Sequence, residues 1–210
     1  HLDSLKRLKR CSWEEIKTQQ ENSHFSAQDI ETFSDNYRAF RKKQRVYDFT
    51  DQLELLLLQL QSGEWFQRIT HLFVDEAQDL SPIQWKMYDI LKKNSKHTIL
   101  AGDDDQAIFK WAGADVDSFI ALKGQYLPLT QSYRIPAKVH GLAMGIINKI
   151  RNRIDKTWEP RVSQCNLHRH FDIESIDMSQ GDWLVLSRTR HMLTDIGESL
   201  YRQGLYYKNK

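Results

Sequence analysis

Two adjacent carboxylates follow an apolar run near the middle of the chain. Leu72-Phe73-Val74 reads as the end of a buried parallel strand, and Asp75 and Glu76 come directly after it. Open α/β sheets bind their ligands at this carboxyl edge. One carboxylate there can hold Mg²⁺ through its waters while the other polarises an attacking water, as nucleotide hydrolysis requires. On their own, however, two carboxylates more often mark a strand that simply runs out into solvent.

A second group of acids follows the next apolar run. Residues 98–102 predict another buried strand, and Asp103-Asp104-Asp105 comes directly after it. Between the two strands, Ser81-Pro82-Ile83-Gln84 predicts a helix that starts with a capping box and ends near Asn94. A strand, a helix and a strand with acids at both strand ends predict a parallel sheet whose site lies along one edge.

The loop after the second acid group carries residues suited to nucleotide and base recognition. Gln106 is a polar side chain directly behind the acids, where it could contact a nucleotide. Phe109 and Trp111 lie close to Gly113, in a stretch too short and too glycine-interrupted for a core element. An aromatic ring in such a loop can stack on a base or pack beneath the loop, and the pattern alone leaves both open.

The first 45 residues are polar and carry charges of both signs. Weak helical signals surround Trp13 and extend over residues 27–40. Five cations then fall within residues 38–45. A solvated helix face is the usual explanation for such a run, and a phosphate-contacting surface is the alternative.

Leucines crowd residues 53–60, which predicts a helix buried on most sides. Asp48 or Thr50 can cap its start, and Gly63 ends it. Much further along, residues 126–129 resemble a short third strand. Pro128 within that run indicates a sheet edge or a strand end.

The last third of the chain predicts two more helices. Residues 136–150 keep one apolar stripe at helical spacing, whereas residues 151–180 lose this periodicity. Residues 182–187 then predict a buried strand. A final helix over residues 193–200 should be closed by Gly204.

Composition limits the class of protein. The 210 residues are 40% hydrophobic and 28% charged, as in a soluble globular protein of one large or two small domains. A net charge of +2 is too small to indicate a nucleic-acid partner by itself. Cys11 and Cys165 lack metal-ligand spacing and favour a reducing compartment, and His168 and His170 lack a nearby third ligand. No signal peptide or membrane-spanning apolar run is visible.

Three segments match a known family in order and spacing. They are residues 74–79 (VDEAQD), which resemble helicase motif II, residues 102–114 (GDDDQAIFKWAGA), which resemble motif III, and residues 129–134 (LTQSYR), which resemble motif IV. The family is that of superfamily 1A DNA helicases of the UvrD/Rep/PcrA type. Residues 48–53 and 183–207 are similar to further segments of the same helicases.

This resemblance implies an α/β fold, namely an incomplete P-loop NTPase (RecA-like) parallel sheet with flanking helices. Residues 1–45 would form part of a helical insertion. Residues 46–135 would be the core of a first RecA-like motor domain, and residues 136–210 the start of a second. The phosphate-binding loop Gly-x-x-x-x-Gly-Lys-[Ser/Thr] does not occur in the chain. We therefore expect the middle of a longer helicase, which alone hydrolyses little or no ATP.

The resemblance also implies roles toward ATP. Asp75 would hold the Mg²⁺ of Mg-ATP, and Glu76 would activate the hydrolytic water. Gln106 would sense the γ-phosphate and couple it to the DNA site. Tyr133 would stack on the adenine ring. Arg134 would stabilise charge on the transferring phosphoryl group, a role worth about 10³–10⁵ in rate.

The implied partner is single-stranded DNA, or DNA with a single-stranded tail. Trp111 would stack on a base, with Phe109 nearby, for about 1–3 kcal/mol per stacked base. The chain departs from the family where Ala112 replaces a frequent Arg, Phe109 a common Tyr and Ser132 a frequent Asn. By family analogy, movement would run 3′ to 5′ in the cytoplasm of a bacterial, archaeal or phage-infected cell.

Two other functions remain open from the sequence. A helicase-like scaffold without ATPase activity would bind DNA or a protein partner, although the Asp75, Glu76, Gln106 and Arg134 set would then be superfluous. A metal-dependent nuclease using Asp75, Asp79 and residues 103–105 is the weaker alternative, and it would cleave DNA with Mn²⁺ and no nucleotide.

Overall fold

The computed structural model describes residues 2–19, 25–63, 68–163 and 165–208. The chain forms two compact units: His1–Thr130 with Ile146–Thr157 (unit 1), and Gln131–Gly145 with Trp158–Lys210 (unit 2). The helices are α1 (Leu2–Lys9), α2 (Trp13–Gln19), α3 (Ala27–Gln44), α4 (Phe49–Ser62), α5 (Pro82–Lys93), α6 (Val116–Ile120), α7 (Ala137–Ile147) and α8 (Met192–Arg202). The strands are β1 (Ile69–Val74), β2 (Ser95–Leu100), β3 (Gln131–Pro136) and β4 (Glu159–Arg161), and the short 3₁₀ turns include η1 (Ala77–Asp79), η2 (Asp104–Gln106) and η3 (Lys110–Ala112).

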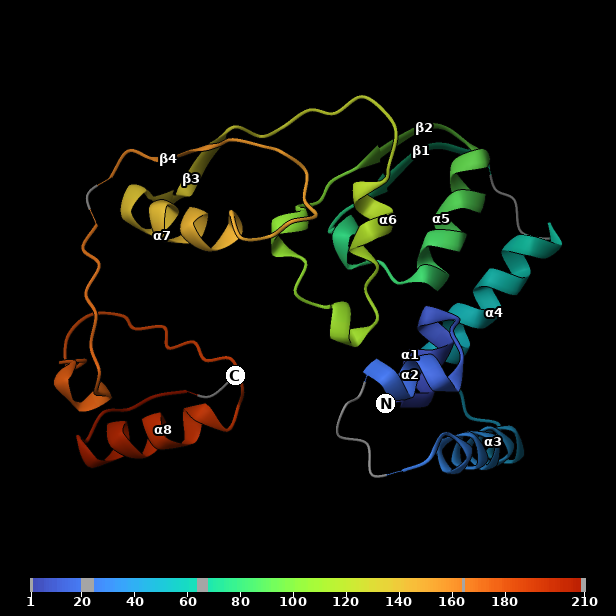
Figure 1. Ribbon diagram of the computed structural model, residues 1–210, viewed down its shortest axis with the longest axis horizontal. Coiled ribbons are helices and arrows are strands. Elements are labelled where there is room, and N and C mark those ends of the chain that lie inside the picture. The colour runs from blue at the N-terminus through green and yellow to red at the C-terminus, as the bar shows by residue number, and fades with distance from the viewer. Residues whose placement is uncertain (1, 20–24, 64–67, 164, 209–210) are drawn as a thin grey trace. The chain divides into compact units, whose positions relative to one another are not determined.

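The centre of unit 1 is a parallel pair of strands joined through a helix, which confirms the predicted strand–helix–strand order. β1 pairs with β2 from Ile69↔Ser95 to Val74↔Leu100, and α5 connects them (Figure 1). The Ser81–Gln84 capping box is present, and α5 ends before Asn94. The protein is therefore a mixed α/β protein with both acidic strand ends on one sheet edge.

The strands are covered on one face only, so the predicted buried strands are in fact exposed on their other face. Leu72 and Leu100 pack against a buried cluster that includes Trp85 of α5 and Phe119 of α6. On the opposite face, Phe73 is 68% exposed and Ile99 is 53% exposed. Successive side chains of a strand point to opposite faces, and α5 and α6 supply cover for one of them.

The leucine-rich helix α4 is also buried on one side rather than on most sides. Asp48 caps it through a capping box with Asp51, and Gly63 follows in the left-handed conformation at φ +74°. Leu57 and Leu60 are 2% exposed and pack with residues of α5. The remaining leucines of this run that face solvent are Leu55, Leu56 and Leu58.

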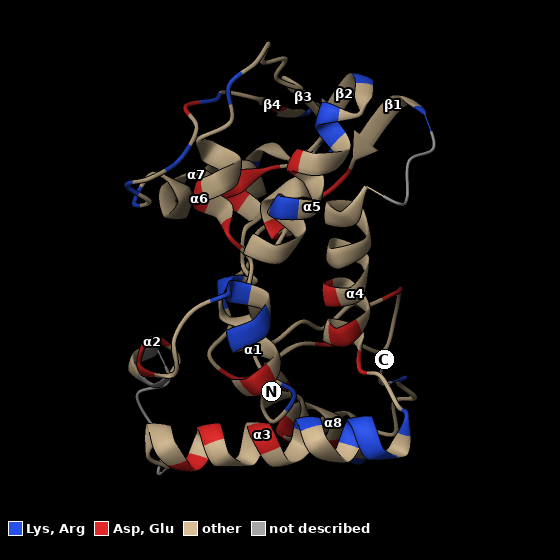
Figure 2. Cartoon of the chain, turned by 90° about the vertical axis from the view of Figure 1, so that its right-hand side faces the viewer, with Lys and Arg blue, Asp and Glu red and all other residues tan. Residues whose placement is uncertain are grey.

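The helical predictions at Trp13 and over residues 27–40 are confirmed by α2 and α3, whereas α1 was not predicted. In α3, acidic residues lie toward the start and basic residues toward the end (Figure 2). The basic run is not wholly solvated, because Arg41 is only 5% exposed.

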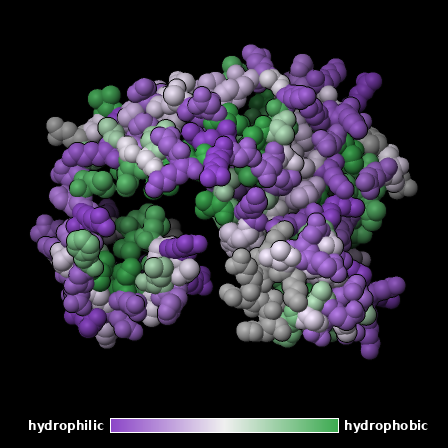
Figure 3. Space-filling model, viewed as in Figure 1, coloured by the Kyte–Doolittle hydropathy of each residue, from purple (hydrophilic) through white to green (hydrophobic). Residues whose placement is uncertain are grey.

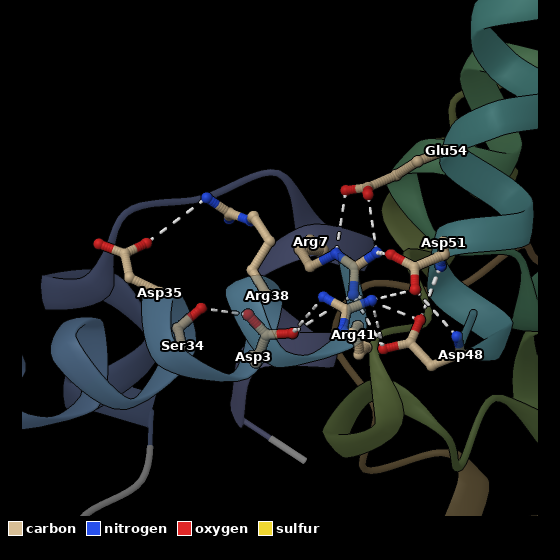
Figure 4. A network of polar contacts seen from close by, with 9 residues as sticks. All are labelled: Asp3, Arg7, Ser34, Asp35, Arg38, Arg41, Asp48, Asp51 and Glu54. Carbon is tan, nitrogen blue, oxygen red and sulfur yellow. Dashed lines mark hydrogen bonds and ion pairs between the residues drawn. The ribbon is translucent and has the colours of Figure 1, made fainter. Parts of the chain in front are cut away.

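Arg41 of α3 and Arg7 of α1 form a buried ion network with α4 (Figure 4). Arg7 donates to Glu54 at 2.7 Å and 3.1 Å and to Asp51 at 2.5 Å. Arg41 pairs with Asp51 and lies 3.1 Å from Asp48. The network therefore joins three helices through two guanidinium groups. Its charged members are Asp3, Arg7, Arg41, Asp48, Asp51 and Glu54.

Unit 2 contains a second parallel pair, in which Gln131 of β3 faces Glu159 of β4. The third strand predicted at residues 126–129 is wrong, because this stretch is irregular and the strand begins at Gln131. The helix predicted over residues 136–150 is α7, which ends at Ile147.

The buried strand predicted at residues 182–187 is also wrong. The segment is irregular, and Leu184 and Leu186 are more than 80% exposed. Figure 3 shows apolar side chains at the surface beside α8 in this unit. The last predicted helix is confirmed as α8, and Gly204 follows it at φ +71°. None of the helices in the described ranges has the length and apolar character to cross a membrane.

Candidate nucleotide site at the ends of β1 and β2

Both carboxylates after β1 are exposed at the sheet edge. Asp75 accepts a hydrogen bond at Oδ1 from the backbone N–H of Glu76, at 2.9 Å. Glu76 adopts the left-handed conformation with φ +50° and ψ +42°, which is uncommon for a residue other than glycine. Such conformations persist only where the surroundings hold them, and they gather at functional sites.

The neighbouring Gln78 holds this turn in place. It is 2% exposed, and its Nε2 donates to Glu76 Oε2 at 2.8 Å. Its Oε1 accepts from the backbone N–H of Asp103 at 3.0 Å. A Cβ on Gly102 would lie 2.8 Å from that same oxygen, so only glycine leaves room for the amide. Gln78 was not singled out from the sequence, where its position between the acids Glu76 and Asp79 was the available signal.

Gln106 lies at the end of η2, directly behind the second strand end. Its side chain is exposed, and Nε2 donates to Asp103 Oδ2 at 2.6 Å. Asp103 also accepts from the backbone N–H of Asp105 at 3.2 Å. The structure thus brings Asp75, Glu76 and Gln106 to one edge of unit 1.

The three aspartates after β2 are ion-paired with the segment that follows α7. Arg153 donates two hydrogen bonds to Asp105, at 2.9 Å and 2.7 Å. Lys156 pairs with Asp104 and lies 3.0 Å from Asp103 and 3.1 Å from Asp105. We call Arg153, Lys156 and the three aspartates the aspartate clamp.

The clamp shifts the pKa values of its members. Burial disfavours the charged form of Asp105, but hydrogen bonds from Arg153 and Lys156 outweigh it and hold the pKa of this carboxyl below its usual value. Burial likewise opposes the charge of Lys156, yet its aspartate partners raise the pKa of this ammonium. Because the carboxylates are paired with cations, the clamp does not favour a nuclease centre, and no group of three or more potential ligands for a metal ion occurs among the described residues.

The aromatic residues of the next loop are at the surface. Phe109 is 43% exposed and Trp111 is 63% exposed, with ring centroids 6.4 Å apart and tilted by 51°. The alternative that both rings pack beneath the loop is therefore wrong.

A cavity of about 250 Å³ adjoins Phe109. Phe49, which is 86% exposed, lines the same cavity and was not singled out from the sequence. Asp79 also lines it, and Asp79 Oδ1 is buried without a hydrogen-bond partner among the described residues. Burial first and Glu76 second raise the pKa of Asp79.

Tyr133 and Arg134 lie on β3 of unit 2, and both side chains are exposed. Asp75, Glu76 and Gln106 belong to unit 1. The convergence of all five around one nucleotide remains a prediction.

Comparison with known proteins identifies the family. The UvrD/REP helicase N-terminal domain family matches residues 2–127. The chain is 31% identical over 122 residues to the ATP-dependent DNA helicase Rep of Buchnera aphidicola, covering 53% of this chain and 18% of the relative. It is 27% identical over 208 residues to the ATP-dependent DNA helicase PcrA of Leuconostoc citreum, covering 84% and 28%. It is 32% identical over 113 residues to Rep of Escherichia coli, covering 49% and 17%. The chain therefore spans less than a third of the length of these relatives. The chain belongs to the UvrD/REP helicase family.

Proposed function

We propose that this chain is part of an ATP-dependent DNA helicase that couples Mg-ATP hydrolysis to movement along single-stranded DNA. The observation that carries the proposal is the shared edge of β1 and β2. There, hydrogen bonds through Gln78 and Asp103 connect Glu76 to Gln106, and Asp75 accepts from the backbone N–H of Glu76. Ligands of parallel α/β sheets bind at such an edge.

The residues at this edge fit Mg²⁺ and an attacking water. Asp75 is exposed, and its Oδ2 has no hydrogen bond to a described residue, so a carboxylate oxygen is available to a hard cation. When bound, Mg²⁺ would neutralise charge on the phosphate oxygens. The exposed Glu76 carboxylate would orient the attacking water and accept its proton. Gln106, whose amide is exposed, would contact the terminal phosphate.

Two further residues, Tyr133 and Arg134, belong to the proposed ATP-binding set. We propose that residues 46–135 are the core of a first RecA-like domain and that residues 136–210 begin a second. Tyr133 would stack on adenine, and Arg134 would stabilise the transferring phosphoryl group. Their exposure on β3 leaves both side chains accessible to a nucleotide.

The DNA site is assigned to the aromatic loop of unit 1. Exposed Trp111 and Phe109 offer rings on which successive bases can stack. Phe49 adds a third exposed ring beside the cavity that Phe109 lines. Movement is proposed to run 3′ to 5′.

The test is ATP hydrolysis by the full-length protein with and without oligo-dT. We expect DNA to stimulate hydrolysis and Glu76→Gln to lower kcat by about 10²-fold or more, because proton transfer to a positioned carboxylate contributes that much. Glu31→Gln, an exposed change on α3, is the matched control. The 210-residue chain alone, which has no phosphate-binding loop, should hydrolyse little ATP. A full-length protein that binds oligo-dT but hydrolyses no ATP would instead establish the scaffold alternative.

A further inference from the structure

We propose that Gln78 is a positioning residue for ATP hydrolysis, whose buried amide fixes the Glu76 carboxylate relative to the loop that carries Gln106. The proposal rests on the proposed function, because it assigns Glu76 to the attacking water. Gln78 is 2% exposed and has no access to substrate, so it would act only through the groups it binds.

The partners of Gln78 determine which way its amide faces. The backbone N–H of Asp103 can only donate, and it lies 3.0 Å from Oε1. A carboxylate such as that of Glu76 can only accept, and its Oε2 lies 2.8 Å from Nε2. A flipped amide would lose both hydrogen bonds. This position therefore requires a side chain that donates to Glu76 and accepts from the Asp103 N–H, and the planar amide of glutamine does both.

The turn that presents Glu76 depends on such support. Glu76 is in the left-handed conformation, and its long side chain is exposed, so neighbouring groups must hold the carboxylate if it is to keep one orientation. The backbone of the turn is anchored separately, because Ala77 N–H donates to Ala101 O at 3.0 Å. The Gln78 amide adds a hydrogen bond to the Glu76 carboxylate itself, from a side chain that is buried.

The same amide connects Glu76 to the second strand end. Asp103 donates to Gln78 Oε1 through its backbone N–H and accepts from Gln106 Nε2, at 2.6 Å, through its carboxylate. Glu76, Gln78, Asp103 and Gln106 thus form one continuous path of hydrogen bonds. A displacement of Gln106 by a terminal phosphate would be transmitted to the carboxylate that faces the water.

The experiment compares variants of the full-length protein in DNA-stimulated ATP hydrolysis. Gln78→Met keeps the shape and removes both hydrogen bonds. Gln78→Glu keeps the acceptor for the Asp103 N–H but places a carboxylate against Glu76. We expect kcat to fall about 10²-fold in both, the typical cost of a misplaced reacting group, with the KM for ATP changed less than about threefold. Gln59→Met, at an exposed position of α4, should leave both constants unchanged.

A double-mutant cycle separates positioning from a general structural role. Residues that act as one unit are strongly non-additive, so Gln78→Met should cost almost nothing further in a Glu76→Gln background. An equal loss in both backgrounds, a loss expressed in KM, or unchanged kcat in Gln78→Met would each overturn the proposal. If Glu76→Gln alone leaves kcat intact, the proposed function fails instead. Fluorescent ATP-analogue binding and thermal melts verify folding of each variant, and Gln78→Glu carries the test if Gln78→Met does not fold.

Discussion

The aspartate clamp gives a sharp stability prediction for Lys156→Met. This change keeps most of the side-chain volume but removes the ammonium that contacts all three aspartates. The Asp104 side chain is 2% exposed and would keep only its hydrogen bond from the Ile154 N–H, at 2.7 Å. Asp105 would keep Arg153. The variant therefore leaves the buried Asp104 carboxylate without an ion pair to a described residue.

The expected loss in the free energy of unfolding is about 3 kcal/mol. Breaking a buried ion pair by removing one partner costs about 3–5 kcal/mol, and the low end applies because the Lys156 side chain is itself 14% exposed. For a chain of this length, about 1 kcal/mol corresponds to about 2–4 °C in Tm. The melting temperature should therefore fall by about 6–12 °C.

The assay is a thermal melt at neutral pH together with hydrogen exchange over residues 101–106. Lys149→Met is the matched control, because this lysine is exposed and lies in the same segment of unit 1. We expect faster exchange at residues 101–106 in Lys156→Met and no change in the control. A Tm loss no larger than that of Lys149→Met, with unchanged exchange, would refute the reasoning, since the clamp would then be worth no more than a surface ion pair.

Four further predictions rest on contacts among the described residues. Gly102→Ala should lower stability by about 1–3 kcal/mol, because its Cβ would lie within 3 Å of a buried amide oxygen and of the Phe119 ring, and urea unfolding measures this loss. Arg7→Met should cost about 3 kcal/mol in the same measurement, because Glu54 loses its cation and Asp3, Asp48 and Asp51 are left to share Arg41 alone, and an unchanged midpoint would contradict the network's role. The lowered pKa of Asp105 contributes stability above its ordinary pKa of 3.8, and this stability is lost as pH falls through the lowered value. In thermal melts across the acid range, the Tm of Asp105→Asn should therefore fall less with decreasing pH than the Tm of the unmodified protein. The raised pKa of Lys156 contributes stability below its ordinary pKa of 10.5, and this stability is lost as pH rises through the raised value. In thermal melts across the alkaline range, the Tm of Lys156→Met should therefore fall less with increasing pH than the Tm of the unmodified protein.

The order of the strands and the helix at the acidic edge could be predicted from the sequence, whereas the burial of these elements could not. The capping box at Ser81 and the apolar runs before Asp75 and Asp103 depend on neighbouring residues, so the strand–helix–strand order and the acidic edge could be predicted. Burial could not be predicted in the same way. Phe73 and the exposed leucines of α4 are apolar, yet whether they are covered depends on elements distant in sequence.

The supporting contacts were harder still to foresee. Gln78 reads as an ordinary polar residue between two acids, and its role appears only when Asp103 is brought 3.0 Å away by strand pairing. Arg153 and Lys156 are 48 and 52 residues from their partners, in a stretch without periodicity. The strand expected at residues 182–187 failed for a related reason, because a run of apolar residues specifies no strand unless another strand pairs with it.

The route of the chain bears on how this protein can be dissected. Residues 146–157 return to unit 1 after β3 and most of α7 have contributed to unit 2, and they bring the cations of the aspartate clamp with them. A truncated gene that stops at residue 130 would therefore encode β1, β2 and the three aspartates of the clamp but neither Arg153 nor Lys156. The η2 turn that carries Gln106 should be less stable in its product, so low activity of such a truncation would say little about the full-length protein.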